Sequence, residues 1–347
     1  KLSYEGSKKL WHYDADSDAL YFVAEPYKTL FTNQNALRLS QKRRGEFAMQ
    51  QSESNADTLV QPVTSGSFAH TEVFEQELLA YPHLFFKEEA DYWVWKLIRN
   101  YVPPGQDFHQ VSVQLEAPAK SGTATVRVYL TGASNIISGD DHIVTLTLVS
   151  DGNEVSQLAT WDGFDEKVVE LEIEQALLTN GNLTVRFESA LGGAWQLLDR
   201  IEVDYQREMR ADSNQLWMKG LEAGTYTVQG LSSPDVYLVE SPTENAVWRN
   251  DLLVEPDGNG SYSATFTLQR NTDVLISVDA AVYEPLITAD VSSNLKARNN
   301  QSEYLIIAPL GLANTAEALQ EYRQGTHGKV KIAWLQDVYD EFSHGRV

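Results

Sequence analysis

The stretch Thr-Ala-Thr-Val-Arg-Val-Tyr-Leu, at residues 123–130, alternates its side chains with a period of two. Successive side chains of an extended strand point to opposite faces of a sheet, so this stretch predicts a half-buried β-strand. The residues expected to face outward are Thr123, Thr125, Arg127 and Tyr129. The residues expected to face a core are Ala124, Val126, Val128 and Leu130.

The same alternation recurs along most of the chain, with clusters of Gly, Asn, Asp and Pro between the runs. Asp151-Gly152-Asn153 and Asn180-Gly181-Asn182 are two such clusters, and Gly and Asn accept the positive φ angles of tight turns. We therefore expect a mainly β protein of tandem β-sandwiches, beginning with a jelly-roll-like sandwich at residues 104–206. Its other apolar sets are Val144, Leu146 and Leu148; Val169, Leu171 and Ile173; Leu183, Val185 and Phe187; and Ile201, Val203 and Tyr205.

Three further regions flank this sandwich. Residues 207–300 hold more alternating runs around the turn Asp257-Gly258-Asn259-Gly260, and they predict an immunoglobulin-like sandwich. Residues 1–103 are less regular and are expected to form an N-terminal β-rich region with a hairpin near residues 14–18. Residues 301–347 predict the start of an α/β domain.

That last region predicts one βαβ unit. A strand at 304–308 precedes a helix that should begin at the N-cap Asn314, with Glu317 as its capping-box partner, and end at Gly325; a second strand follows at 329–335. Parallel strands are normally covered on both faces. A lone βαβ unit cannot provide that cover, so more of the polypeptide or a partner should complete the sheet.

Charge and composition exclude several classes of function. The 347 residues contain 27 Lys and Arg against 49 Asp and Glu, a net charge of −22. A surface this acidic repels nucleic acid and anionic membranes. There is no cysteine, so neither a disulfide nor a thiol nucleophile can come from these residues. No apolar run is long enough for a membrane span. Because Lys1 is not preceded by Met or a signal peptide, we expect the chain to begin inside a longer precursor.

One short motif resembles a calcium loop. Asp14, Asp16, Asp18 and Glu25 occupy positions 1, 3, 5 and 12 of such a loop, but Ala19 replaces the glycine at position 6. No flanking helices are evident. An acidic hairpin turn is the favoured interpretation, and calcium is the one cofactor that the sequence raises.

A second acidic cluster is Asp140-Asp141-His142, which opens a strand. It could be a calcium-binding or sugar-binding loop, but a solvated turn is the favoured interpretation. Four tryptophans could stack on a pyranose or lie in the core. They are Trp161, Trp195, Trp217 and Trp248.

Motifs for catalysis are absent. The chain has no Gly-x-Ser-x-Gly, His-Glu-x-x-His, Walker A or dinucleotide-binding pattern, so we assign no catalytic, cofactor-binding or metal-binding residue and leave open whether the chain is an enzyme. Lys42-Arg43-Arg44 is expected to be an exposed loop or a site for trypsin-like cleavage.

The C-terminal tail resembles the beginning of the catalytic domain of gingipain-like cysteine peptidases. The segments that carry the resemblance are Glu-Tyr-Leu-Ile-Ile-Ala-Pro at 303–309, Leu-Gln-Glu-Tyr-Arg at 319–323, Gly-Lys-Val-Lys at 328–331 and Asp-Val-Tyr-Asp-Glu-Phe-Ser-His-Gly at 337–345. Upstream, residues 10–14, 20–22 and 31–35 are similar to the segment that opens the β-rich region of bacterial relatives.

The resemblance implies a secreted bacterial cysteine endopeptidase with a caspase-like catalytic domain. The family's catalytic His and Cys lie beyond the last matching segment, so His344 is not that His and no catalytic residue is carried over. This chain would be the prosegment or accessory β domains, at the outer-membrane surface or outside the cell. Its partners would be the rest of the catalytic domain, in cis or as a second chain cleaved near Arg346, and protein or peptide substrates. The alternative is a carbohydrate-binding or adhesive extracellular β-sandwich protein.

Overall fold

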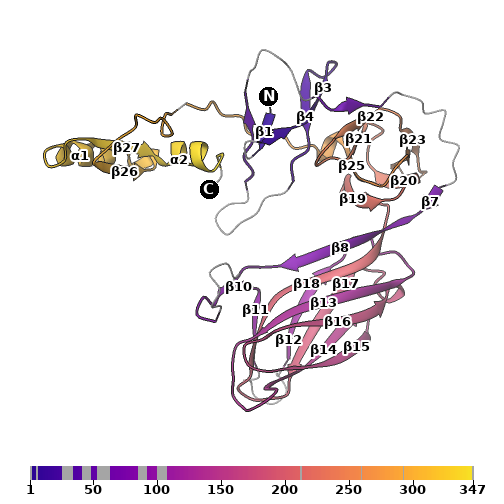
Figure 1. Cartoon of the computed structure of the whole chain (residues 1–347). Coiled ribbons are helices and arrows are strands. Elements are labelled where there is room, and N and C mark those ends of the chain that lie inside the picture. The colour runs from indigo at the N-terminus through magenta and orange to yellow at the C-terminus, as the bar shows by residue number, and fades with distance from the viewer. Residues whose placement is uncertain are drawn as a thin grey trace. The chain divides into compact units, whose positions relative to one another are not determined.

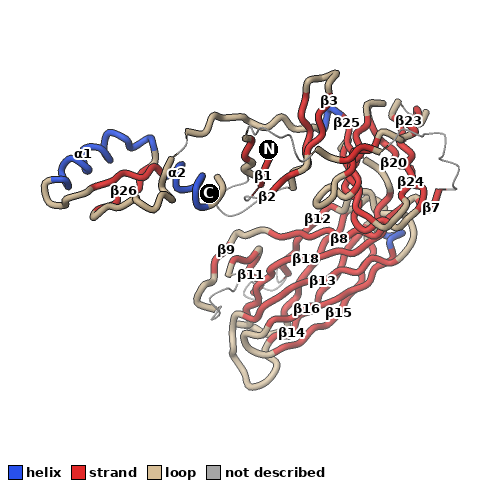
Figure 2. The backbone as a smooth tube through the Cα atoms, turned by 45° about the horizontal axis from the view of Figure 1, so that its top comes forward, coloured by secondary structure: helices blue, strands red, loops and turns tan. Residues whose placement is uncertain are grey.

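The computed structural model describes residues 2–4, 7–25, 34–40, 48–52, 63–84, 92–99, 108–211, 213–258, 260–291 and 293–345. The chain forms two compact units. One combines residues 1–53, 239–250 and 282–347, and the other combines residues 54–238 and 251–281. Strands dominate both units, so the prediction of a mainly β fold with sandwiches is confirmed (Figures 1 and 2).

The larger unit contains a jelly-roll-like sandwich of two sheets. Its strands are β8 (Ser67–Glu75), β11 (Lys96–Arg99), β12 (Phe108–Gln114), β13 (Thr123–Gly132), β14 (His142–Ser150), β15 (Asn153–Trp161), β16 (Glu166–Glu174), β17 (Asn182–Ser189) and β18 (Trp195–Glu208). One sheet has the order β11-β18-β13-β16, with β8 also paired to β18, and the other has the order β12-β17-β14-β15. A short hairpin of β9 (Leu79–Ala80) and β10 (Trp93–Val94) and a 3-10 turn at Gln175–Leu177 complete this part.

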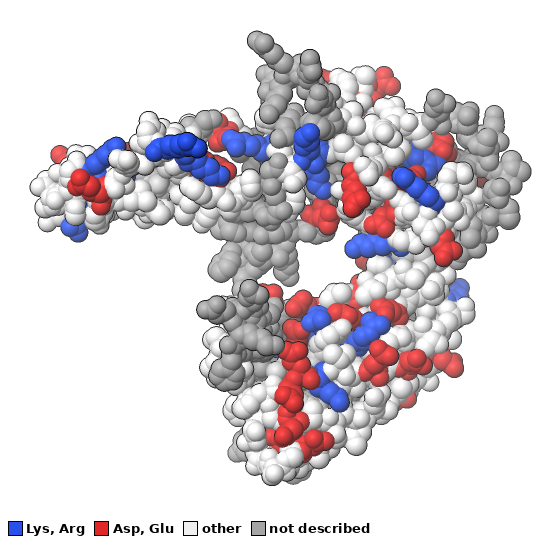
Figure 3. Space-filling view, viewed as in Figure 1, with Lys and Arg blue, Asp and Glu red and all other residues white. Residues whose placement is uncertain are grey.

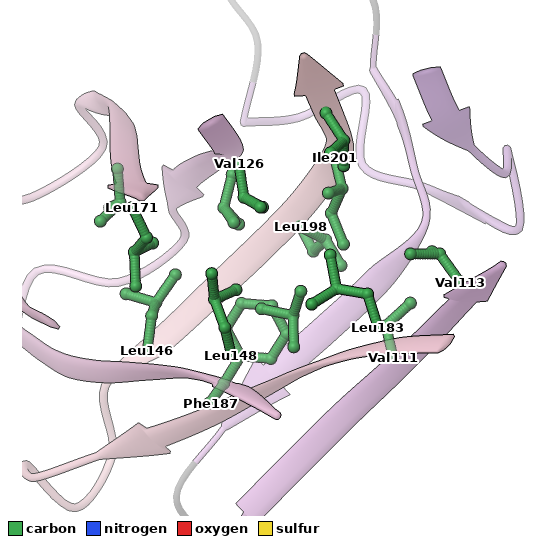
Figure 4. Close-up of a cluster of buried hydrophobic side chains, with 14 of the residues drawn as sticks. Val111, Val113, Val126, Leu146, Leu148, Leu171, Leu183, Phe187, Leu198 and Ile201 are labelled. Carbon is green, nitrogen blue, oxygen red and sulfur yellow. The ribbon is translucent and has the colours of Figure 1, made fainter. Parts of the chain in front are cut away.

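The core of this sandwich lies between the two sheets (Figure 4). The apolar row of β13, at positions 124, 126, 128 and 130, is buried, and the opposite row is exposed or half-buried. Each of the other predicted apolar sets is also buried in the same cluster. The period-two pattern therefore predicted the core correctly.

A second, smaller sandwich belongs mostly to the same unit. Its strands are β7 (Val63–Ser65), β19 (Gln215–Leu221), β20 (Gly224–Leu231), β21 (Val236–Glu240), β23 (Leu253–Pro256), β24 (Tyr262–Leu268) and β25 (Thr272–Val278), followed by a 3-10 turn at Asp279–Ala281. One sheet has the order β23-β24-β20-β7, and β19 pairs with β25. Phe68, from β8, packs in this core, whereas Phe74, from the same strand, packs against the jelly-roll core. Strand β8 therefore contributes to both cores.

The surface of the jelly-roll sandwich is rich in charge (Figure 3). On the sheet that holds β13, Arg127 forms ion pairs with Glu170, Glu202 and Asp204 from the two neighbouring strands. Arg200 lies 3.7 Å from the ring centroid of Tyr129. The outward row of this sheet is thus a solvated network of charges, as expected for the face opposite a core.

The other unit contains the N-terminal strands and one strand from later in the chain, β22 (Val247–Arg249). The N-terminal strands are β1 (Leu2–Tyr4), β2 (Ser7–Lys9), β3 (Trp11–Asp14), β4 (Ala19–Phe22), β5 (Arg38–Leu39) and β6 (Gln50–Gln51). β3 and β4 pair with Asp14 opposite Ala19, so the predicted hairpin is confirmed. The ring of His12 stacks on Trp248, with 4.1 Å between centroids, which fixes this hairpin against β22.

The C-terminal part is the predicted βαβ unit, formed by β26 (Tyr304–Ala308), α1 (Ala313–Gln324) and β27 (Val330–Trp334) and followed by α2 (Leu335–Phe342) (Figure 1). The two strands are parallel, and Gly325 caps the C-terminus of α1 as predicted. The predicted N-cap was wrong. A 3-10 turn at Leu310–Leu312 leads directly into α1, so Leu312 is the N-cap and Asn314 already lies in the first helical turn, where its side chain and Glu317 form no capping box.

Neither helix in the described part of the chain is long and apolar enough to cross a membrane. α1 has 12 residues and α2 has 8.

Candidate functional site

The βαβ unit covers one face of its small sheet with its own helix. The residues on that face are Ile306, Ala308 and Val330, which pack with Ala316 of α1 in one buried cluster. Tyr304, Leu319, Ile332 and Trp334 border the same cluster. The helix therefore covers the apolar side chains on the face of the sheet that points toward it.

The opposite face of this sheet is open over β26, whereas Ala333 of β27, on the same face, is buried. Leu305 and Ile307 alternate with the covered residues of β26, and they are 52% and 57% exposed. The continuous apolar run at 304–308 predicted a strand covered on both faces, and the described residues supply cover for one. Among those residues the sheet has two strands, so each strand also has an unpaired edge. A parallel sheet with an apolar face and free edges is a surface for further strands.

The segment before β26 is attached to the same unit through Glu341 of α2. The Glu341 carboxylate accepts hydrogen bonds from the backbone N–H groups of Leu295, at 2.8 Å, and Lys296, at 2.9 Å, and from the hydroxyl of Ser293. The Ser293 hydroxyl, together with these two amides, lowers the pKa of Glu341. Lys296 also lies over the ring of Phe342, 5.1 Å from its centroid.

This attachment is expected to weaken at low pH. Because the pKa of Glu341 is lower in the folded chain than its unfolded value of 4.5, the stabilisation is complete above pH 4.5 and is lost as pH falls through the depressed pKa. We expect the hydrogen-exchange protection factors of the Leu295 and Lys296 amides to fall over that window. Glu341→Gln, which does not titrate, should remove this pH dependence; if the variant kept it, another carboxyl would be responsible.

The candidate calcium loop is a self-contained turn. The Asp14 carboxylate accepts hydrogen bonds from the Asp16 N–H, at 3.1 Å, and the Ser17 hydroxyl, at 2.6 Å, and Tyr13 donates its hydroxyl to Asp18 at 2.7 Å. The Ser17 hydrogen bond is the main reason that the pKa of Asp14 is lowered. The hydrogen bond of Glu25 is made by its backbone carbonyl, which accepts from the side-chain amide of Asn35. No group of three His, Asp or Glu side chains placed to hold a metal occurs in the part of the chain that the structure describes.

The prediction of a solvated turn at Asp140-Asp141-His142 was wrong for two of its three residues. Asp140 is exposed, but Asp141 and His142 have no solvent exposure. The Asp141 carboxylate accepts the backbone N–H groups of Ile136, at 2.8 Å, and Gly163, at 2.9 Å. These loops come together from different parts of the chain, so only the folded structure reveals that the carboxylate joins them.

His142 continues this buried network. Its Nε2 lies 2.7 Å from the Gly163 carbonyl, and its Nδ1 lies 3.1 Å from the amide nitrogen of Gln196. The Gly163 carbonyl can only accept a hydrogen bond, so Nε2 is the donor in that contact. The ring stacks on Trp161 at 4.8 Å between centroids. The network is therefore structural, and it holds the loops at one end of the jelly-roll sandwich.

The four tryptophans have different environments. Trp161 and Trp248 are buried, and Trp217 is half-buried, so these three serve packing. Trp195 is exposed. A stacking platform for a sugar can therefore be built on Trp195 but not on Trp161 or Trp248.

His344 lies in the turn after α2. The basic run at 42–44, residues 31–33 of the N-terminal similarity and Arg346 lie outside the described residues.

Comparisons with known proteins give a fold and no sequence family. No protein-family model matches the chain, and no curated protein matches it. A crystal structure of dimeric latent PorU from Porphyromonas gingivalis matches 97% of the chain, with a TM-score of 0.57 and 16% identity. The fold is similar to that of latent PorU. The chain spans 31% of the length of that protein.

Two carbohydrate-binding modules match smaller parts of the chain. One is the module TmCBM61 in complex with β-1,4-galactotriose, with 15% identity and a TM-score of 0.22 over 41% of this chain and 89% of the module. The other is the CBM22-1 xylan-binding domain of Paenibacillus barcinonensis Xyn10C, with 14% identity and a TM-score of 0.21 over 43% of this chain and 91% of that domain. These scores are too low to carry an argument about function.

Proposed function

We propose that this chain is the accessory β region and the first βαβ unit of a gingipain-like cysteine peptidase related to PorU. The observation that carries the proposal is the open parallel sheet, whose exposed Leu305 and Ile307 need further strands or helices to cover them. The similarity in fold to latent PorU over nearly the whole chain supports it. The rest of the catalytic domain would then complete this sheet.

The proposed chemistry needs residues from outside this chain. A cysteine peptidase attacks the peptide carbonyl with a thiolate that a His activates, and these 347 residues contain no cysteine. The β-sandwiches would act as a prosegment, a folding aid or a module that positions protein substrates. We place the parent protein at the outer surface of a bacterium or outside the cell, as the fold similarity suggests.

Hydrogen exchange tests this proposal. The backbone amides on the outer edges of β26 and β27 should exchange quickly in the 347-residue chain, because these edges are unpaired. They should be protected at least tenfold more strongly in a longer natural polypeptide that includes the proposed α/β remainder. The amides of β13, whose strand is paired on both sides, serve as the internal control and should not change.

Equal protection of β26 and β27 in both polypeptides would contradict the proposal, since the unit would then be complete by itself. The same holds if the natural gene encodes no His and Cys after this region.

A carbohydrate-binding module is the second candidate, and the exposed Trp195 is the observation that favours it. Glycan binding that is lost in Trp195→Ala would support this candidate. Trp161→Ala is not a suitable test, because Trp161 packs on His142 and its removal would disturb the fold.

A further inference from the structure

Three loops at one end of the jelly-roll sandwich present large apolar side chains to solvent. We call these four residues the loop patch: Ile136, Ile137, Phe164 and Trp195. They are 43%, 48%, 48% and 41% exposed, respectively. They come from the β13–β14 loop, the β15–β16 loop and the start of β18. Most exposed apolar residues on a soluble protein are scattered singly, so a group of four marks a contact surface.

The three loops lie beside one another. The Trp195 N–H donates to the Ser134 hydroxyl at 3.0 Å, and the Ala133 N–H donates to the Trp195 carbonyl at 2.8 Å. The Gly132 N–H donates to the Asp165 carbonyl at 3.0 Å. A methyl group added to Gly193 would lie 3.9 Å from the Cδ1 atom of Ile136. The patch therefore belongs to one continuous surface.

The buried network beneath the patch fixes its shape. The Asp141 carboxylate accepts from the N–H groups of both Ile136 and Gly163, and His142 Nε2 donates to the Gly163 carbonyl. A Cβ atom at Gly132 would lie 1.9 Å from the Gly163 carbonyl oxygen, so the two loops approach as closely as glycine permits. A surface held in this way loses little conformational entropy when it binds a partner.

The charges around the patch are mostly acidic, and Arg99, the Cα partner of Trp195 in the β11–β18 pair, is a basic exception. The loop residues 133–141, 162–166 and 190–195 contain no Lys or Arg. Their exposed charged residues are Asp140, Asp162, Asp165 and Glu166. An apolar centre with an acidic rim complements a partner that has apolar and basic side chains. Two of the four patch residues are isoleucines, which offer no flat ring for a pyranose, so the composition favours a polypeptide over a sugar.

We propose that the loop patch is a docking site for a polypeptide segment with alternating apolar and basic side chains. The site is separate from the open α/β sheet and does not depend on the proposed peptidase function. Phe164 and Ile137 supply the apolar contacts, and Asp162 and Asp165 attract the basic side chains.

Titration calorimetry of the 347-residue chain with three synthetic seven-residue peptides tests this proposal. The probes are an alternating Lys/Leu peptide, a Lys/Ser peptide of equal charge and a Glu/Leu peptide of opposite charge. We expect the Lys/Leu peptide to bind at least tenfold more tightly than the Lys/Ser peptide, and the Glu/Leu peptide not to bind. The Lys/Ser peptide measures the contribution of the overall charge alone.

Variants locate the binding. Phe164→Ser and Ile137→Ser should each remove the tenfold preference for the Lys/Leu peptide, and Asp162→Asn with Asp165→Asn should weaken its binding several-fold. The matched control is Leu158→Ser, because Leu158 is an exposed apolar residue of β15 outside the patch, and it should bind like the wild type. Unchanged preference in Phe164→Ser and Ile137→Ser would overturn the proposal, as would glycan binding lost in Trp195→Ala without any peptide preference.

Discussion

Replacing Asp141 with Ala is expected to lower the free energy of unfolding of the jelly-roll sandwich by about 2–5 kcal/mol. The carboxylate is fully buried and accepts two backbone N–H groups, from Ile136 and Gly163. Without it the Gly163 N–H stays buried and unpaired, at a cost of about 1–3 kcal/mol, and the part-buried Ile136 N–H loses its acceptor. The loops that they belong to would separate at the same time.

Chemical denaturation of the 347-residue chain measures this effect. Asp141→Asn keeps one acceptor oxygen and should lose only part of the stability. The matched control is Asp140→Ala, which removes the adjacent exposed carboxylate and should leave the denaturation midpoint close to that of the wild type. A similar midpoint for Asp140→Ala and Asp141→Ala would refute the structural role of Asp141.

The second large effect concerns two neighbouring residues of β26. Ile306 is buried against α1, whereas Ile307 points to the open face and is mostly exposed. In the 347-residue chain, Ile306→Asp should unfold the βαβ unit, because a carboxylate in an apolar core is strongly unfavourable. Ile307→Asp should leave that unit folded.

In the proposed complete peptidase the two variants should behave alike. If further strands and a helix cover Ile307, as proposed, Ile307→Asp should prevent the catalytic domain from forming and reduce peptidase activity by at least a hundredfold. Thr326→Asp, at an exposed turn after α1, is the control and should keep its activity. Full activity of Ile307→Asp would mean that this face stays open to solvent and that the proposed completion of the sheet is wrong.

The strands of the sandwiches were predictable because their pattern is local. In β13 and β17 the period of two places each apolar side chain on the buried face, and no distant contact is needed to see it. Turn residues such as Asp151 and Gly152, both with positive φ, also follow from local chemistry.

The buried network at Asp141 and His142 was not predictable in the same way. In the sequence these residues follow Asp140 and have the charge of a solvated turn. Their partners Gly163 and Gln196 are 22 and 54 residues away from them, respectively, along the chain. Burial of a charged side chain depends on such distant donors, and no local pattern reveals them.

The open face of the βαβ unit lies between these two cases. The apolar run at 304–308 correctly predicted a strand, and the helix after it ends at Gly325 as predicted. The error at Asn314 arose because the 3-10 turn before α1 places the chain in a helical path two residues early. A side chain can cap a helix only where the backbone is still extended.

Strand β8, which contributes side chains to both sandwiches, has a consequence for how the two sandwiches evolve. Phe68 and Phe74 of β8 pack in different sandwiches, and Tyr205 of β18 belongs to the jelly-roll core. A break in the gene within β8 or β18 would remove buried side chains from at least one of the two cores. The two sandwiches are therefore expected to be gained, lost or duplicated together in evolution.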